Sequence, residues 1–229
     1  MLRKPISDVF FDLDHTLWDF ERNSALTYRN IFEEHDLELP LDDFLGHYVP
    51  LNLQFWKKYR EGRITKENLR YKRLKTVFDL MDFSISDSAI HRLSDAYIEQ
   101  LSSHTHLVPN CLEILEYLKG KYRLHIITNG LEEVQFRKLR NSRINTYFTE
   151  VVNSDRAGVK KPDPGIFRVA LEATGIRPEA GVMIGDSLEA DIKGAHSVGL
   201  QALHFNVHRE PEHQLCPIIQ DLREIKSYL

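Results

Sequence analysis

Two aspartates stand at the end of an apolar run near the start of the chain, in the stretch VFFDLDHTLW at residues 9–18. Asp12 and Asp14 are separated by one residue, and a carboxylate at the end of a buried segment costs desolvation energy unless a partner compensates it. A hard cation such as Mg²⁺, which prefers oxygen ligands, is such a partner. A D-x-D pair by itself is also typical of a turn or a helix cap, so its meaning depends on the other polar residues of the chain.

Further polar residues follow three later segments whose composition is typical of strands. Because the ligands of an open parallel sheet bind beyond the carboxyl ends of its strands, we expect these residues to meet Asp12 and Asp14 there. Taken singly, each has a plainer interpretation as a turn, a solvated loop residue or a helix cap. As a set they complete one charge arrangement. These residues are Thr128, Lys161, Asp186 and, five positions further on, Asp191.

Phosphoryl transfer is the chemistry that this set supports. Asp12 is the expected nucleophile, which gives an aspartyl-phosphate intermediate. A carboxylate that approaches an anionic phosphate meets like-charge repulsion, and a cation must offset it. Asp12 and Asp186 offer carboxylate ligands for Mg²⁺, and Lys161 adds a fixed positive charge.

The remaining polar groups suit the phosphate and the proton. Thr128 and the backbone N–H groups of Asn129 and Gly130 can donate hydrogen bonds to phosphate oxygens. Asp14 can protonate the leaving oxygen and later deprotonate water. The sequence therefore predicts a small phosphorylated substrate and a requirement for Mg²⁺.

The elements that must position these residues follow from the hydrophobic pattern. Residues 6–13 predict a short buried strand of the parallel type. Residues 18–104 have helical spacing without a convincing strand and predict about four helices. From residue 105 onward strands and helices alternate, which favours a parallel sheet with helices on both faces. The later strands are expected at 123–127, 149–154, 182–185 and, last, 201–205, and the later helices at 110–120, 131–141, 165–175 and 188–199.

This pattern predicts an α/β core of residues 1–17 and 105–229, with an all-helical domain inserted at 18–104. The chain has 229 residues, 42% of them hydrophobic, which suffices for a sizeable core.

A formal net charge of −4 gives no reason to expect a nucleic-acid polymer as partner. Two distant cysteines, Cys111 and Cys216, argue against a disulfide scaffold. With no apolar run of membrane-spanning length, we expect a cytoplasmic monomer or homodimer without a membrane partner.

Four motifs of this chain resemble those of the haloacid dehalogenase superfamily, in the same order. They are DLDHT at 12–16, ITNG at 127–130, KKPDPGIF at 160–167 and GDSLEADIKGA at 185–195. The resemblance implies a Rossmann-like parallel-sheet core, in which residues 18–104 correspond to a helical cap inserted after the first motif.

The resemblance also implies a role for each motif residue. It implies that Asp12 is the nucleophile, and that Asp14 is the acid/base and a Mg²⁺ ligand through its backbone carbonyl. It makes Asp186 a metal ligand and Asp191 the second acidic position of the fourth motif, acting on the metal through water or through Lys161. Thr128 and Lys161 match the phosphate-binding positions; Lys161 is favoured over Lys160 because it adjoins Pro162.

Two departures from the family pattern bear on function. The family often has glycine where this chain has His15. Dehalogenating members lack an aspartate at the position of Asp14, because displacing a halide needs no proton donor, so Asp14 favours hydrolysis of phosphate esters.

A finer resemblance points to bacterial pyrimidine 5′-nucleotidases of this superfamily. It rests on LWDF after the first motif, W-x-x-Y-x-x-G-x-I-T at 56–65 and FNVHRE at 205–210. It implies a nucleoside 5′-monophosphate as substrate. The alternatives are a phosphatase for a sugar phosphate or phosphoglycolate, a phosphomutase, a dehalogenase, and a binding protein that has only the fold.

Within the helical insertion, Asn52 is a candidate substrate contact. Residues 57–75 hold nine Lys or Arg against two Glu. This run is consistent with attraction of a phosphorylated substrate, but a solvated helical face is its more ordinary explanation.

Overall fold

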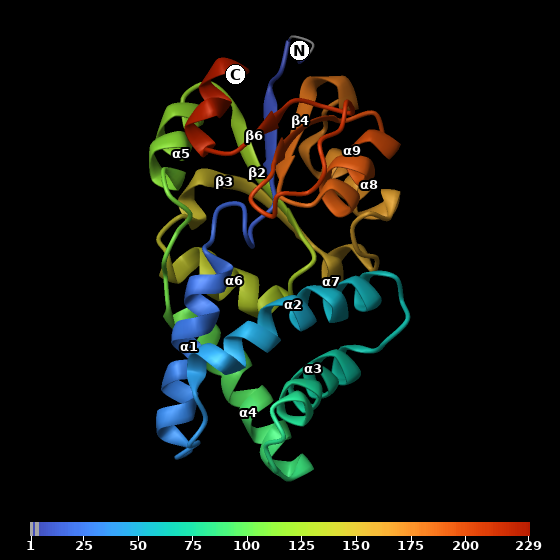
Figure 1. Ribbon diagram of the computed structural model, residues 1–229. Helices are drawn as coiled ribbons and strands as arrows, with labels where there is room; N and C mark the ends of the chain where they lie inside the picture. The colour runs from blue at the N-terminus through green and yellow to red at the C-terminus, as the bar shows by residue number, and fades with distance from the viewer. Residues whose placement is uncertain (1, 3–4) are drawn as a thin grey trace. The chain divides into compact units, whose positions relative to one another are not determined.

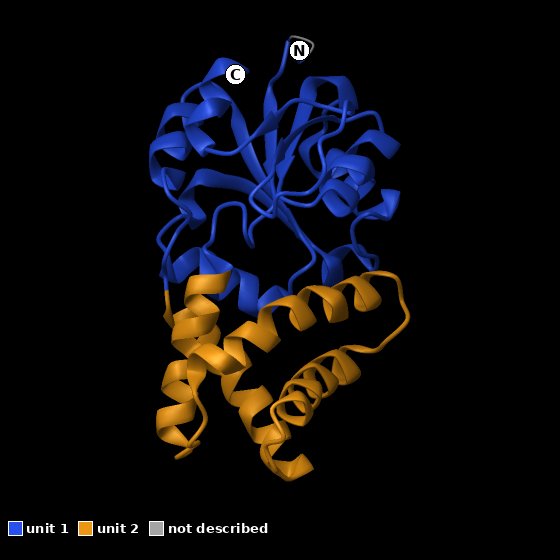
Figure 2. Ribbon diagram, in the orientation of Figure 1, with its two compact units in different colours: residues 1–20, 105–229 blue, residues 21–104 orange. Residues whose placement is uncertain are grey.

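The computed structural model describes residue 2 and residues 5–229 (Figure 1). The chain divides into two compact units, residues 1–20 with 105–229 and residues 21–104 (Figure 2). The first is called the sheet unit below and the second the helical unit. A cap function for the helical unit stays a prediction.

The sheet unit is built on a six-stranded sheet in the described part of the chain, with the order β3-β2-β1-β4-β5-β6 and every neighbouring pair parallel. The first strand lies in the middle, between β2 and β4, so the chain reverses its direction of winding there. Such a switch point opens a crevice beyond the strand ends. The strands are β1 Asp8–Phe11, β2 Arg123–Thr128, β3 Phe148–Asn153, β4 Gly181–Gly185, β5 Gln201–Phe205 and β6 Ile218–Ile219.

The predicted α/β class with a parallel sheet is confirmed, but β5 is not the last strand. β6 follows it and pairs with His204 and Phe205. With only two residues, β6 is too short to show a hydrophobic pattern in the sequence.

Helices cover both faces of this sheet, with α5 on one face and α8 and α9 on the other (Figure 1). Phe10, Ile127 and Met183 of three strands pack in one buried cluster with Ile166 and Phe167 of α8. Fully burying each such side chain stabilises the fold by about 1.5–3 kcal/mol. The helical segments of the sheet unit are α5 Cys111–Lys119, α6 Glu132–Asn141, η2 Asn145–Tyr147, α7 Ser154–Ala157, α8 Pro164–Thr174, η3 Pro178–Ala180, η4 Leu188–Lys193, α9 Gly194–Ser197 and η5 Leu222–Ser227.

The expected single helix at 188–199 is instead a π-helical segment, η4, followed by the short helix α9. The backbone N–H groups of Asp191 and Ile192 both donate to the carbonyl of Ser187, at 3.0 and 3.3 Å. A π-helical turn is often found at a functional site, and this one carries Asp191.

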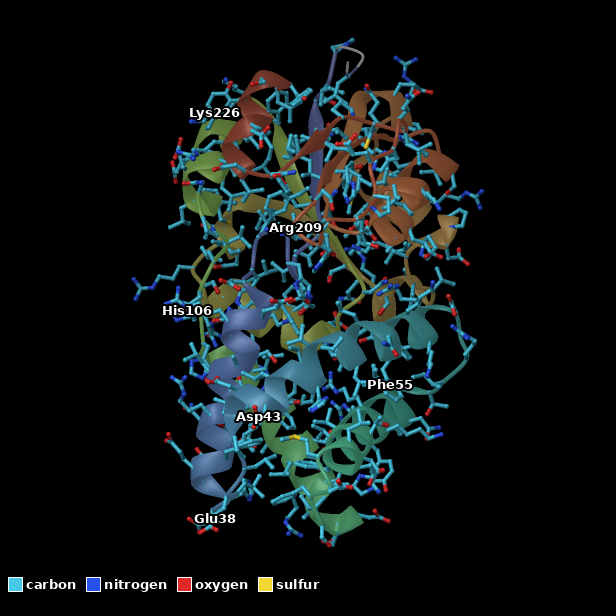
Figure 3. All side chains as sticks on the ribbon, viewed as in Figure 1. Glu38, Asp43, Phe55, His106, Arg209 and Lys226 are labelled. Atoms are coloured by element: carbon cyan, nitrogen blue, oxygen red, sulfur yellow. The ribbon has the colours of Figure 1, made fainter. Side chains whose placement is uncertain are left out.

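The helical unit contains four α-helices among its residues: α1 Phe20–Glu34, which begins one residue before the unit, α2 Leu41–Arg60, α3 Lys66–Leu80 and α4 Asp87–Gln100, followed by η1 Leu101–Ser103. Thr65 and Ser86 cap α3 and α4 by accepting hydrogen bonds from backbone N–H groups. The centre is aromatic, with the ring of Tyr28 4.7 Å from those of Tyr48 and Tyr97. Figure 3 shows the side chains of the described residues and labels Phe55 of α2.

Asn52, the candidate substrate contact, is buried in the helical unit, where its carboxamide oxygen accepts a hydrogen bond from Arg73 at 2.8 Å. Arg73 is the buried member of the basic run 57–75, and the other eight basic residues are at least partly exposed. The described helices include none that is both long and apolar enough to cross a membrane.

A buried polar contact closes the amino end of the sheet. The carboxylate of Asp8 is fully buried and accepts from Nε2 of His125 and Nη2 of Arg123, each at 2.9 Å. Burial lowers the pKa of His125, which favours the neutral imidazole. Asp8 therefore satisfies an imidazole N–H that would otherwise be buried without a partner.

We predict that Asp8→Ala lowers the free energy of unfolding by about 1–3 kcal/mol, because it leaves that N–H unpaired. Urea denaturation measures the change. The control is Asp95→Ala, whose side chain is 78% exposed and 4.0 Å from Arg70, and for which we expect a change within about 0.5 kcal/mol. Equal effects of the two substitutions would contradict the role given to Asp8.

Candidate active site

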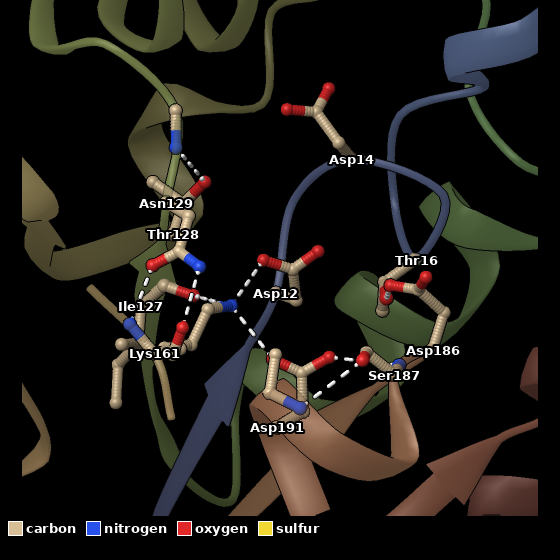
Figure 4. A network of polar contacts seen from close by, with 12 residues as sticks. Asp12, Asp14, Thr16, Ile127, Thr128, Asn129, Lys161, Asp186, Ser187 and Asp191 are labelled. Carbon is tan, nitrogen blue, oxygen red and sulfur yellow. Dashed lines mark hydrogen bonds and ion pairs between the residues drawn. The ribbon is translucent and has the colours of Figure 1, made fainter. Parts of the chain in front are cut away.

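Lys161 lies at the centre of a polar cluster at the carboxyl end of the sheet (Figure 4). Its ammonium is 2.5 Å from Oδ1 of Asp12, 2.7 Å from Oδ1 of Asp191 and 2.6 Å from the carbonyl oxygen of Ile127. The side chain of Lys161 is 2% exposed. Three segments far apart in sequence are thereby joined at one ammonium group.

The strand ends place the carboxylates around this lysine. Asp12 follows β1, and its backbone N–H donates to the carbonyl of Ile184 in β4 at 2.9 Å. One carboxylate oxygen from each of Asp12, Asp186 and Asp191 lies within 4.8 Å of the others. The structure thus brings together acidic residues from the first and the fourth of the motifs.

Close approach of Asp191 to the sheet depends on a glycine. A Cβ atom at Gly185 would lie 2.3 Å from Oδ2 of Asp191, which is too short for any side chain. That oxygen accepts instead from the backbone N–H of Ser187 at 3.0 Å. One carboxylate oxygen of Asp191 thus pairs with Lys161, and the other binds the backbone of the turn between β4 and η4.

Asp186 is held by two donors that the sequence analysis did not assign. The hydroxyl of Thr16 donates to Oδ1 at 3.1 Å, and Nε2 of His208 lies 2.9 Å from Oδ2. Burial opposes ionisation of Asp186, but the hydrogen bond from His208 and the nearby charges outweigh it and lower the pKa of Asp186 to about 2. His208 belongs to the FNVHRE stretch, which the sequence flagged by resemblance without indicating this contact.

The cluster carries more negative than positive charge. Among the carboxylates and the lysine alone, three carboxylates and one ammonium leave an excess of two negative charges. Burial and the like charges around it raise the pKa of Asp12 despite the opposing effect of Lys161. Burial alone disfavours the ammonium of Lys161, but Asp12 and Asp191 outweigh that cost and raise the pKa of Lys161. By charge count, one lysine does not neutralise the three carboxylates.

The donor set fits a hard divalent cation. Carboxylate oxygens are the ligands that Mg²⁺ prefers, and a divalent ion would balance the excess charge. The carboxylates that could hold it are those of Asp12, Asp186 and Asp191, which offer one oxygen each within 4.8 Å of the others.

The T-N-G segment after β2 supports the lysine from the other side. The carboxamide of Asn129 accepts from the backbone N–H of Lys161 at 2.7 Å and donates to its carbonyl at 3.0 Å. The hydroxyl of Thr128 accepts from the backbone N–H of Gly130 at 3.2 Å. From the sequence we expected only the backbone N–H of Asn129 to act, because a side chain that braces a distant loop leaves no pattern in one sequence.

Asp14 is held separately from the Lys161 cluster. Its two carboxylate oxygens accept from Lys138 at 2.6 Å and Gln135 at 2.9 Å, both on α6. The next residue, His15, has φ 65°, a backbone region that favours glycine. The left-handed backbone explains why glycine suits the position that His15 occupies here.

A family model described as haloacid dehalogenase-like hydrolase matches residues 9–205 of this chain. The pyrimidine 5′-nucleotidase YjjG of Escherichia coli is 29% identical over 225 residues, which cover 96% of this chain and 96% of that protein. A glyceraldehyde 3-phosphate phosphatase of Pyrococcus abyssi is 33% identical over 204 residues, covering 87% of this chain and 81% of that protein. The crystal structure of the HAD-hydrolase YfnB of Bacillus subtilis, bound to magnesium, has a TM-score of 0.88 and 27% identity, covering 98% of this chain and 99% of that one.

We predict that Asn129→Ala lowers the free energy of unfolding by about 1–3 kcal/mol, because it removes both hydrogen bonds to the Lys161 peptide. Urea denaturation gives the value. The matched control is Asn145→Ala, at an exposed position of the same unit. The bracing role fails if the two alanine variants are equally stable.

Proposed function

The chain belongs to the haloacid dehalogenase-like hydrolase family, and from that membership and the geometry of the site we propose that it hydrolyses phosphate monoesters through an aspartyl-phosphate at Asp12. The proposed substrates are nucleoside 5′-monophosphates with pyrimidine bases. The proposed cofactor is Mg²⁺.

The placement of Asp12 carries the proposal. Lys161 holds Oδ1, while among the described residues Oδ2 forms no hydrogen bond or ion pair and is available to attack phosphorus. Attack forms the Oδ2–P bond and breaks the ester P–O bond, and the leaving oxygen takes a proton from the carboxyl group of Asp14, which enters this step as the acid. Water then attacks phosphorus and gives a proton to Asp14, and breaking the Oδ2–P bond restores the carboxylate.

Asp14 favours ester hydrolysis over dehalogenation, because an alkoxide leaving group needs a proton and a halide does not. Asp14 lies two residues after the proposed nucleophile Asp12 in the sequence. At the same strand ends, Lys161 offers a positive charge and the hydroxyl of Thr128 offers a hydrogen-bond donor for the phosphate oxygens.

We assign the Mg²⁺ site to the carboxylates of Asp12 and Asp186 and the backbone carbonyl of Asp14. When bound there, the ion offsets the repulsion between the attacking carboxylate and the phosphate. Asp191 acts through Lys161, whose ammonium it holds at 2.7 Å.

The substrate class is supported by the relatives together with the finer sequence resemblance. YjjG and PynA, the latter from Streptococcus pneumoniae and 28% identical over 96% of this chain, are both named pyrimidine 5′-nucleotidases. The second candidate is glyceraldehyde 3-phosphate or a similar sugar phosphate, because the phosphatase of Pyrococcus abyssi shares 33% identity. A cytoplasmic location and a monomeric or dimeric state stay predictions.

We predict that the protein with Mg²⁺ releases phosphate from pyrimidine nucleoside monophosphates faster than from glyceraldehyde 3-phosphate or phosphoglycolate. Asp12→Asn should reduce release by at least about a thousandfold, because the acceptor of the phosphoryl group is lost. Colorimetric phosphate assays measure the rates, with circular dichroism as the check on folding. Faster release from the sugar phosphate would favour the second candidate. A folded Asp12→Asn variant within about tenfold of the parent rate would remove Asp12 from the nucleophile role.

We predict that Mg²⁺ stabilises the protein, by about 2.7 kcal/mol at a concentration one hundred times the dissociation constant. Thermal denaturation in increasing Mg²⁺ measures the effect without any turnover. Asp186→Asn should largely abolish it. Glu189→Gln, at an exposed position in the adjacent π-helical segment, should retain it. An undiminished Mg²⁺ response in Asp186→Asn would contradict the ligand assignment.

A further inference from the structure

Two polar side chains of α6 point into the protein rather than into solvent. Gln135 and Lys138 are 1% and 2% exposed, and they lie three residues apart, which places them on one face of the helix. The apolar residues Val134 and Leu139 of the same helix are also buried. Neither polar residue is needed for the reaction steps proposed above, so their burial requires a separate explanation.

Lys138 is fixed by aromatic rings and by Asp14. Its ammonium lies 4.4 Å from the ring centroid of Trp18 and 5.3 Å from that of Phe20, and donates to Oδ1 of Asp14 at 2.6 Å. A buried ammonium is costly unless a carboxylate pairs with it, and cation–π contacts reduce that cost further. The position of Lys138 therefore constrains the position of the Asp14 carboxylate.

Gln135 joins Asp14 to the phosphate-binding segment. Its amide nitrogen donates to Oδ2 of Asp14 at 2.9 Å and to the hydroxyl oxygen of Thr128 at 2.7 Å. Because that oxygen also accepts from the backbone N–H of Gly130, the hydroxyl hydrogen of Thr128 is left to donate to another group. A Cβ atom at Gly130 would lie 2.3 Å from the side chain of Gln135, so this contact requires the glycine of T-N-G.

Together these contacts determine the direction of the Asp14 side chain. In Figure 4 the carboxyl group of Asp14 points away from the group formed by Asp12, Lys161 and Asp191. Each carboxylate oxygen of Asp14 accepts a hydrogen bond from a side chain of α6, and the two donor residues lie about one helical turn apart. The orientation of Asp14 is thus determined by α6 and not by the lysine at the centre of the cluster.

We propose that Gln135 and Lys138 are positioning residues that hold Asp14 for proton transfer to the leaving oxygen, and that Gln135 also orients the hydroxyl of Thr128. This inference rests on the proposed phosphatase function. A proton donor must lie within hydrogen-bond reach of the atom it protonates. A displacement of about 1 Å can reduce a rate by about a hundredfold.

The test compares leaving groups. An alkoxide needs the proton from Asp14, whereas 4-nitrophenolate leaves readily without one. The value of kcat/KM reports the steps up to formation of the aspartyl-phosphate, and so isolates proton donation from the later attack by water. We expect Lys138→Met and Gln135→Met to reduce kcat/KM for a nucleoside 5′-monophosphate by about a hundredfold. For 4-nitrophenyl phosphate the loss should be at least about tenfold smaller, because little proton transfer is required.

Arg140→Met is the matched control, because Arg140 is exposed on the same helix and its substitution should leave both values unchanged. Equal losses on the two substrates, or no loss on either, would overturn the positioning role. If Lys138→Met fails to fold, Lys138→Gln, which keeps a donor for Asp14, is tested in its place. If its ratio of kcat/KM for the nucleoside monophosphate to kcat/KM for 4-nitrophenyl phosphate equals that of the parent, the positioning role is overturned. If the parent protein hydrolyses neither substrate, the proposed function fails and not this inference alone.

Discussion

The contact on which the site depends is the ammonium of Lys161 between the carboxylates of Asp12 and Asp191. At 2.5 and 2.7 Å, it joins the loop between α7 and α8, the end of β1 and the π-helical segment η4. A buried ammonium and buried carboxylates are stable only if their charges are paired. Here the pairing is incomplete, since Asp186 adds a further carboxylate nearby. The remaining negative charge is what the proposed Mg²⁺ would balance, and the ion would thereby offset the repulsion of an incoming phosphate.

The fold meets this requirement through its strand order. Because β1 lies between β2 and β4, residues that follow these strands reach one crevice although 174 positions separate Asp12 from Asp186. Close packing at the strand ends leaves no room for a side chain at Gly185, where Asp191 approaches the backbone. The lysine is braced in turn by Asn129, which binds both backbone groups of its peptide. Each polar group of the centre is thereby held by a neighbour from a different segment.

Much of this arrangement was predictable from sequence, for a physical reason. Asp12, Thr128 and Asp186 stand directly after apolar runs, so their meeting follows from parallel strand order alone, and the family resemblance is confirmed. What the sequence did not reveal is how side chains cross between elements. His208 reaches Asp186 from a loop, and loops have no periodicity to locate their contacts. Gln135 and Lys138 did leave a signal, since polar residues three apart share the helix face of buried Val134, but amphipathic spacing alone does not identify their partner.

The central claim is that Asp12, beside Lys161 and near Asp186, accepts a phosphoryl group with the help of a divalent cation. A crystal structure with Mg²⁺ and beryllium fluoride, which imitates a phosphoryl group on a carboxylate, tests it most directly. We predict beryllium on Oδ2 of Asp12, fluorine atoms facing Lys161 and Thr128, and Mg²⁺ bound by the carboxylates of Asp12 and Asp186. An unmodified Asp12, with the fluoride or the metal ion bound at other residues, would contradict it.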